Sequence, residues 1–335
     1  MLQIIPKISL LNIGKEMNDP ISKIKLRGYN SGQPVGVTSG LYNQIVDGTI
    51  KPLSISDITS IHCTSRRDIY LKKILRTKDK DSWGKITGNF VESCICEFAE
   101  KYVSNKQVNK LRKYETIMKK SSLYIDEFLK RKKSKILELS QYKSSPEEDE
   151  NWLFRQLDYA LRHELLMLFT SNKLSLAKKN TDDPTQRIEI KPNSKVIGIS
   201  SPSTPDFILP SFSAIGDIKT GPEFKDYFRL TAAGYALAYE NQYGKDHDIN
   251  IGIIYYFPTR KKDISFAHVY IFIIDDALRK EFLRKRDEAL IVMRDANLRP
   301  PIIPKIMEKE KCIYCKYISE CDKQRYTNEE NTSAN

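Results

Sequence analysis

The sequence predicts a mixed α/β protein in which a central mixed sheet is flanked by helices. Helical patterns occupy the chain from about residue 54 to about residue 170. Short apolar segments typical of strands, one helical segment and two longer β-rich segments follow between residues 187 and 274. Strands interrupted by a single crossover helix favour a sheet with both parallel and antiparallel pairs.

The first half of the chain is expected to be irregular and then helical. Residues 1–50 are rich in Gly, Ser and Asn, so we expect an extended segment there. Ser54 or Ser56 can cap a helix that runs to about Leu75, because a serine hydroxyl accepts a hydrogen bond from an N–H of the first turn.

Further helices are expected before residue 170. A second helix covers residues 84–102, and a basic helical segment follows to about residue 139. The segment Ser145-Pro146-Glu147-Glu148 is a capping box with proline at the first helical position. It predicts a helix to about residue 170, with leucines recurring along one face.

The second half carries the strand patterns. We expect short strands at residues 187–190, 196–200, 206–209 and 214–219, a helix at 223–243, longer strands at 249–257 and 266–274, and a last helix at 276–296. Pro300 and Pro301 then end the helical pattern, since proline does not continue a helix.

The composition is that of a globular protein with a strong positive charge. Hydrophobic residues make up 40% of the 335 residues, and the net charge is +12. No apolar run approaches the roughly 20 residues that span a bilayer, so we expect no membrane association. Residues 1–11 contain Pro6 and no small-residue cleavage site, so we expect no signal peptide and a cytoplasmic location.

The positive charge is concentrated in one segment. Residues 101–135 contain twelve Lys or Arg against three acidic residues, with four aromatic residues interleaved. A basic surface with aromatic side chains suits a nucleic-acid backbone with stackable bases. A solvated, Lys-rich pair of helices is the alternative interpretation, and charge alone does not separate the two.

Two carboxylates and a lysine have the spacing of a metal-dependent phosphodiesterase site. Pro205-Asp206 is followed, after ten residues, by Asp217-Ile218-Lys219. Residues i and i+2 of a strand share a face, so Asp217 and Lys219 should project together, and a hairpin can bring Asp206 alongside. Paired carboxylates, with the Ile218 carbonyl, suit Mg²⁺ or Mn²⁺, and Lys219 would orient a water or offset phosphate charge. The alternative is a plain hairpin with surface charges at its ends.

The cysteines predict a second centre. Cys94 and Cys96 lie in an apolar stretch and are interpreted as core residues. Cys312, Cys315 and Cys321 form the C-terminal pattern C-x2-C-x5-C, which supplies three ligands. Cys63 is the remaining candidate for a fourth ligand. Four thiolates suit a structural zinc or an iron–sulfur cluster, and the chemistry of the residues leaves both open.

Together these stretches resemble a known family from end to end. In chain order they are Leu26-Arg27-Gly28-Tyr29, Cys63 to Leu71, Gly88 to Glu92, Pro205-Asp206, Gly216 to Gly221, Ala233 to Glu240 and the C-terminal cysteines. The sequence resembles the PD-(D/E)XK superfamily of RecB-type nucleases. More narrowly, it is similar to the CRISPR-associated exonucleases that carry a 4Fe-4S cluster, in the longer form found with archaeal type I-A CRISPR systems. The split cysteine arrangement favours iron–sulfur over zinc.

The resemblance implies a restriction-endonuclease-like core with a helical insertion and a cysteine-ligated cap. The implied organisation is an extended segment (1–55), a helical region with the basic insertion (56–182), the nuclease core (183–300), the cysteine cap (301–325) packing with Cys63, and a disordered tail (326–335).

The resemblance also implies residue roles. The implied ligands of Mg²⁺ or Mn²⁺ are Glu92, Asp206, Asp217 and the Ile218 carbonyl, and the implied iron–sulfur ligands are Cys63, Cys312, Cys315 and Cys321. Lys219 would be the catalytic lysine, and Tyr235 would act on the substrate side.

The chain departs from the family pattern at two positions. Glu92 stands where these nucleases usually carry a histidine ligand, and glutamate can also bind Mg²⁺ or Mn²⁺. His163 is a fallback ligand, although a lone histidine on an apolar helix is more often a packed residue. Thr231 stands where a longer glutamine usually precedes the motif tyrosine.

The expected function is that of a metal-dependent DNA exonuclease acting in CRISPR spacer acquisition, on single-stranded or splayed DNA. Expected partners are DNA and CRISPR adaptation proteins such as the integrase, and the protein could form an oligomer. The alternative is a catalytically weak or inactive nuclease-fold subunit that binds DNA in an adaptation complex.

Overall fold

The structure is a computed structural model. It describes residues 39–60, 63–77, 83–98, 114–140, 153–155, 157–162, 189–209, 213–221, 223–243, 248–258, 268–296, 301, 312, 315 and 317–321. His163 and the tail expected at 326–335 lie outside these residues.

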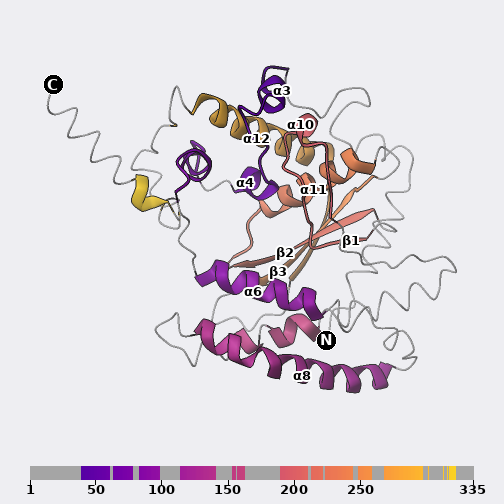
Figure 1. Ribbon diagram of the computed structural model, residues 1–335. Coiled ribbons are helices and arrows are strands. Elements are labelled where there is room, and N and C mark those ends of the chain that lie inside the picture. The colour runs from indigo at the N-terminus through magenta and orange to yellow at the C-terminus, as the bar shows by residue number, and fades with distance from the viewer. Residues whose placement is uncertain are drawn as a thin grey trace.

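Within the described residues, a four-stranded sheet of order β1-β2-β3-β4 forms the centre of the fold (Figure 1). Its strands are β1 (Phe207–Leu209), β2 (Ala214–Gly221), β3 (Ile251–Pro258) and β4 (His268–Ile273). β2 and β3 are parallel, whereas β1–β2 and β3–β4 are antiparallel. The predicted mixed sheet is confirmed, and the chain crosses from β2 to β3 through a helix, as expected.

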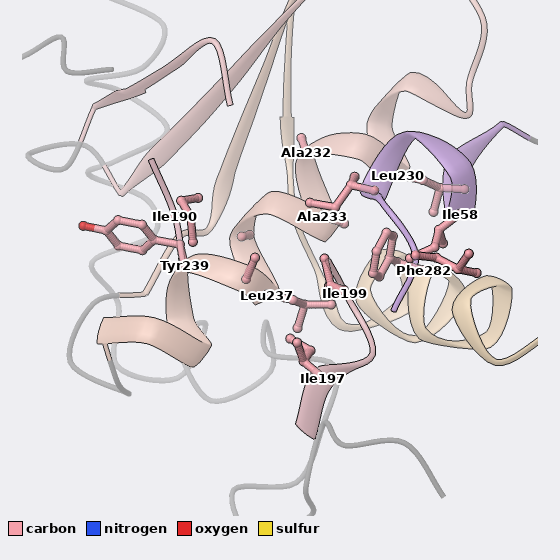
Figure 2. Packing of buried hydrophobic residues seen from close by; sticks show 14 of the residues in the cluster. Ile58, Ile190, Ile197, Ile199, Leu230, Ala232, Ala233, Leu237, Tyr239 and Phe282 are labelled. Carbon is pink, nitrogen blue, oxygen red and sulfur yellow. The ribbon is translucent and has the colours of Figure 1, made fainter. Parts of the chain in front are cut away.

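One face of the sheet is covered by the crossover helix and the last long helix (Figure 1). These are α11 (Phe228–Tyr243) and α12 (Asp276–Asp295), and three short helices pack around them: α3 (Ser39–Val46), α4 (Ile55–Thr59) and α10 (Ser194–Ile197). Figure 2 shows side chains from these elements meeting in one apolar cluster, which we call the α11-side core. Gly234 allows the close approach of α11, since an added Cβ would lie 2.5 Å from the Phe282 ring of α12.

The opposite face carries two layers of helix (Figure 1). α6 (Trp83–Phe98) lies on the sheet, and α8 (Tyr114–Ser140) packs on α6. The rings of Phe98 and Phe128 join these helices edge to face, 5.4 Å between centroids. With helical residues 153–162, where described, they enclose the α6-side core.

Strand β3 contributes to both cores because it is buried along its whole length. Ile251 and Ile253 join the α6-side core, whereas Ile254 and Tyr256 join the α11-side core. This alternation fixes which β2 side chains face α11 and which face α6.

The prediction of a single helix from Ser54 or Ser56 to Leu75 is wrong. Ser54 does cap a helix, because its side chain accepts a hydrogen bond from the Asp57 N–H, but that helix is α4 and ends at Thr59. Arg66 then takes a left-handed backbone conformation, φ 56°. The chain resumes as a one-turn helix α5 (Arg67–Ile69) and a wider turn η1 (Tyr70–Ile74).

Three further expectations are corrected. α3 is helical within residues 1–50, which we expected to be irregular. Of the strand expected at 187–190 the structure describes residues 189–190, where Ile190 bridges Ser203. The strand expected at 196–200 is reduced to the bridge of Ile199 with Leu53, and α10 occupies its start. The expected helix at 223–243 begins at Phe228. No helix in the described part of the chain is long and apolar enough to cross a bilayer.

Candidate carboxylate–lysine site and cysteine cap

The β1–β2 hairpin brings the two predicted aspartates together. Phe207 pairs with Gly216, so the next pair in register is Asp206 with Asp217. The Phe207 ring covers Gly216 so closely that an added Cβ would lie 1.9 Å from it, which explains the glycine. Asp206 Oδ2 also accepts a hydrogen bond from the Ile218 backbone N–H. Opposed Cβ atoms in such ladders are about 5 Å apart, a separation that lets two carboxyl groups reach one cation.

Alternation along β2 places the next two side chains as the sequence predicts. Ile218 packs against the α6-side core, while Asp217 and Lys219 project on the opposite face and form an ion pair. The Asp217 side chain is only 4% exposed. Its Oδ2 atom contacts the Lys219 ammonium but has no aligned hydrogen-bond donor among the described residues. A buried carboxylate oxygen that depends on an ion pair alone has remaining capacity for a ligand.

Helix α6 supplies the third carboxylate. Gly88 lies directly over the end of β2, since an added Cβ would be 2.3 Å from Thr220 Oγ1. Glu92 follows one helical turn later, on the same face of α6. Its charge acts on both Asp206 and Lys219, so Glu92 lies near the other charged groups of the site.

The charges of this site shift the pKa values of Asp206 and Lys219. Burial, followed by the charges of Asp217 and Glu92, holds the pKa of the Asp206 carboxyl well above its usual range, and the Ile218 N–H and Lys219 offset this only in part. Burial lowers the pKa of the Lys219 ammonium, but the neighbouring carboxylates outweigh burial, and the pKa of Lys219 is raised. Three carboxyl groups against one ammonium leave an excess of negative charge when all are ionised.

Helix α11 places Tyr235 at this site and Thr231 away from it. Burial, with the charges of Asp217, Asp206 and Glu92, raises the pKa of the Tyr235 phenol far above its usual range, so the hydroxyl remains protonated. Thr231 is buried, and its Oγ1 lies 3.3 Å from Thr59 Oγ1 of α4. Thr231 therefore joins two helices and does not point toward a substrate.

The cysteine cap is anchored by Arg67, a residue for which the sequence suggested no role. The Arg67 guanidinium donates a hydrogen bond to the Pro301 carbonyl and another to the Cys321 thiol. The short C-terminal helical turn accordingly lies beside the segment that contains Cys63 (Figure 1). A buried arginine beside a cysteine-rich segment is a signal that could have been recognised in the sequence.

The early and late cysteines act on one another. Burial raises the pKa of the Cys321 thiol, with added contributions from Cys63 and Cys312. Burial also raises the pKa of Cys315, with contributions from Cys321 and Cys63. Cys63 therefore lies close enough to Cys315 and Cys321 to act on both thiols, while its role as a ligand of a shared centre stays a prediction.

The donor sets at both sites have the chemistry of metal ligands, although the side chains are engaged with one another. Among the residues that the structure describes, no three His, Cys, Asp or Glu side chains converge closely enough to hold an ion as they stand. At the carboxylate–lysine site, Asp206 accepts a hydrogen bond from the Ile218 backbone N–H, and Asp217 is paired with the Lys219 ammonium. The incompletely satisfied Asp217 Oδ2 and the crowded oxygen donors fit a hard divalent cation, for which Lys219 would have to move aside.

The fold and the site define a class of protein: an α/β protein in which helices cover both faces of a mixed sheet, with carboxylates and a lysine close together at neighbouring strands. The family model of the CRISPR-associated exonuclease Csa1 matches residues 1–322. Because this match covers nearly all of the 335 residues, the chain belongs to the CRISPR-associated exonuclease Csa1 family. No curated protein sequence matches the chain. The expected relationship to CRISPR-associated exonucleases is confirmed at the level of this family.

Proposed function

We propose that the protein is a metal-dependent DNA exonuclease of the PD-(D/E)XK type that acts on single-stranded or splayed DNA. One observation carries the proposal: three carboxylates, from the residue before β1, from β2 and from α6, all act on the lysine of β2, and one of them is paired with it: Asp206, Asp217, Glu92 and Lys219. Burying several like charges costs free energy, so their gathering favours a functional role over a structural one.

The chain's own groups fit distinct parts of phosphodiester hydrolysis. The three carboxylates, with the Ile218 carbonyl, would hold Mg²⁺ or Mn²⁺, which when bound polarises a phosphate and lowers the pKa of a water ligand. Asp217 would exchange the Lys219 ammonium for the cation. Lys219, still protonated because its pKa is raised, could then donate hydrogen bonds to a phosphate oxygen or an attacking water. The protonated Tyr235 hydroxyl could donate a further hydrogen bond to the DNA backbone.

The test is degradation of end-labelled single-stranded DNA in Mn²⁺ and in Mg²⁺. We expect Asp217→Asn and Lys219→Met each to reduce the cleavage rate by roughly a hundredfold or more, as loss of a positioned catalytic group does. Lys191→Ala is the control, because Lys191 is an exposed lysine whose side chain is 69% accessible. Wild-type rates in both site variants would remove this cluster from the mechanism.

A second candidate function is a non-catalytic DNA-binding subunit. Two observations favour it: Glu92 replaces the histidine of related nucleases, and Thr231 is buried against Thr59. This alternative predicts salt-sensitive DNA binding without cleavage in any divalent metal ion. The same cleavage assay, with anisotropy measured in EDTA over a salt series, separates the two functions.

The proposed biological role is trimming of DNA ends before integration during CRISPR spacer acquisition, together with adaptation proteins such as the integrase. The support is the family's CRISPR association. Co-purification with the integrase and the length of newly acquired spacers, compared between wild type and Asp217→Asn, would test it. Spacers of unchanged length would contradict a trimming role.

For the cap we propose a 4Fe-4S cluster held by Cys63, Cys312, Cys315 and Cys321, with structural zinc as the alternative. Mutual interaction of the thiols and the Arg67 contact support a shared centre. Anaerobic purification should give a brown protein whose broad visible absorbance is lost in Cys315→Ser. Cys94→Ser is the matched control, because burial raises the pKa of Cys94 to about 12 and keeps it a core thiol. A colourless protein that contains zinc would favour the alternative.

A further inference from the structure

A strip of aromatic side chains lies beside the carboxylate–lysine site. It consists of Phe224, Tyr227, His268, Tyr270 and Phe272, and we call it the aromatic strip. The last three alternate along β4 onto the α11 face of the sheet. Phe224 stacks on Tyr270 with 3.9 Å between ring centroids and an interplanar angle of 30°. β4 is the outer strand of the described sheet, and every residue along it keeps some exposure.

The strip begins close to the proposed catalytic lysine. Lys219 is paired with Tyr256 across β2 and β3, and Tyr256 is paired with His268 across β3 and β4. Paired residues share a face and neighbouring strands are about 4.8 Å apart, so the backbone of His268 lies about 10 Å from that of Lys219. At a rise of about 3.4 Å per stacked nucleotide, this distance corresponds to about three nucleotides.

Tyr256 lies between the two sites. It is buried and donates a hydrogen bond of 2.6 Å to the Gly221 carbonyl at the end of β2. Its ring meets those of Phe224 and His268 at centroid distances of 5.8 and 6.3 Å. The exposed His268 ring therefore adjoins a group of packed aromatic rings.

Residues 223–229, beside the strip, carry equal numbers of basic and acidic side chains. Lys225 lies over the Tyr227 ring at 5.9 Å, and Arg229 lies over the Phe272 ring at 5.7 Å. Glu223 and Asp226 are exposed in the same segment. Because this segment has no positive excess and the strip itself is formed by rings, the strip is suited to the flat faces of bases more than to phosphates.

We propose that the aromatic strip binds the bases of single-stranded DNA next to the carboxylate–lysine site, with His268 and Tyr270 as the stacking surfaces. The inference rests on the proposed function for the nature of the strand, but base binding itself does not require cleavage. A strip that only closes the edge of the α11-side core would bind no base.

The experiment measures anisotropy of the full-length protein with a fluorescein-labelled 15-nucleotide oligothymidine, in EDTA so that no cleavage occurs. The matched probe is an abasic strand of equal length, which keeps the phosphates and lacks bases. His268→Leu and Tyr270→Leu keep apolar volume but remove the planar ring, and His268→Phe restores a ring. Tyr243→Leu is the control, since Tyr243 is an exposed aromatic residue at the other end of α11.

We expect each leucine variant to weaken oligothymidine binding about tenfold, the usual loss for one stacked base, and to leave abasic binding within twofold. His268→Phe and Tyr243→Leu should bind like wild type. Equal affinity of wild type and both leucine variants for oligothymidine, with unchanged thermal unfolding, would overturn the proposal. If oligothymidine binds the strip normally but is not cleaved in Mn²⁺, only the proposed exonuclease activity is contradicted.

Discussion

At the scale of single residues, the candidate site holds carboxyl groups close together against their repulsion. Asp206 is the most perturbed of them, since burial and two neighbouring carboxylates act on it together. Among the described residues, the hydrogen bond that the Asp206 carboxylate accepts from a neighbouring strand comes from the Ile218 N–H. Such an arrangement costs stability and is retained where function needs it.

Asp206→Asn should therefore stabilise the protein while abolishing cleavage. The amide oxygen can still accept from the Ile218 N–H, and the repulsion from Asp217 and Glu92 is removed. We expect urea unfolding at pH 7 to show a gain of about 0.5–2 kcal/mol in the free energy of unfolding. A loss of stability would show that the carboxylate at this position is not strained.

Asp57 provides the opposite case, a buried carboxylate that stabilises the fold. Burial alone would raise its pKa, but Lys72, Lys73 and Ser54 outweigh burial and lower the pKa of Asp57 to about 2. A folded-state pKa below the ordinary 3.8 means that this contribution is present above about pH 4 and is lost as the pH falls toward about 2.

Asp57→Asn should accordingly destabilise the protein by about 2 kcal/mol at pH 7 and much less near pH 2. Urea unfolding of both proteins at a series of pH values gives the difference directly. A difference that stays constant between pH 7 and pH 2 would contradict the assignment of the stabilising charge to Asp57.

At the scale of elements, the predictions that depended on local pattern were confirmed more often than those that depended on packing. β3 was recognisable because it is a long apolar run, which suits a strand buried along its whole length, and β2 because apolar residues flank Asp217. The segment at 196–200 looked like a strand, but Gly198 takes φ 70° after the turn of α10 and leaves only Ile199 to bridge Leu53. The pattern of apolar residues does not reveal that turn.

The predictions about the candidate site show the same difference between local pattern and packing. The spacing of Asp217 and Lys219 predicted their common face, and the hairpin predicted Asp206 beside them. By contrast, the contact of Thr231 with Thr59 joins residues 172 positions apart, and no local pattern predicts which helices meet. The sequence alone therefore identified the acidic donors better than the surface that surrounds them.

The contact of α6 with β2 gives a prediction at this scale. Gly88→Ala should push α6 away from Thr220 Oγ1, displace Glu92 and cost about 1–3 kcal/mol of stability. We expect cleavage to fall with it. The double variant Gly88→Ala/Thr220→Ala should recover both properties, because without Oγ1 the nearest remaining atom is the Cβ at 3.6 Å. If Thr220→Ala does not restore stability and cleavage to Gly88→Ala, the clash with Thr220 Oγ1 is not the cause of their loss.

At the scale of the whole molecule, one buried arginine joins the two helices of the α11 face to the sheet. Arg279 is fully buried on α12 and donates to Glu240 Oε1 of α11 at 2.8 Å and to the Ile249 carbonyl before β3 at 2.7 Å. Glu240 also accepts from the Ile249 N–H. Glu240 belongs to the stretch that resembles the nuclease family, and here its contacts are structural.

Glu240→Ala should destabilise the protein by about 3–5 kcal/mol, because it leaves the Arg279 charge buried and unpaired. Glu138→Ala is the matched control, since its partner Lys135 is 48% exposed and such surface pairs contribute less than about 1 kcal/mol. Chemical unfolding of the two variants at pH 7 makes the comparison. Similar losses in both would mean that the buried network contributes no more than a surface pair.

The hydrogen bond from Arg67 to the Pro301 carbonyl has a consequence for biosynthesis. The two residues are 234 positions apart, so translation at 5–20 residues per second separates their appearance by roughly 10 to 50 seconds. All four sheet strands emerge during that interval, before Cys312, Cys315 and Cys321. The nascent sheet can thus fold ahead of the cap, and Cys63 stays apart from the late cysteines until the strand that carries Asp217 and Lys219 has emerged.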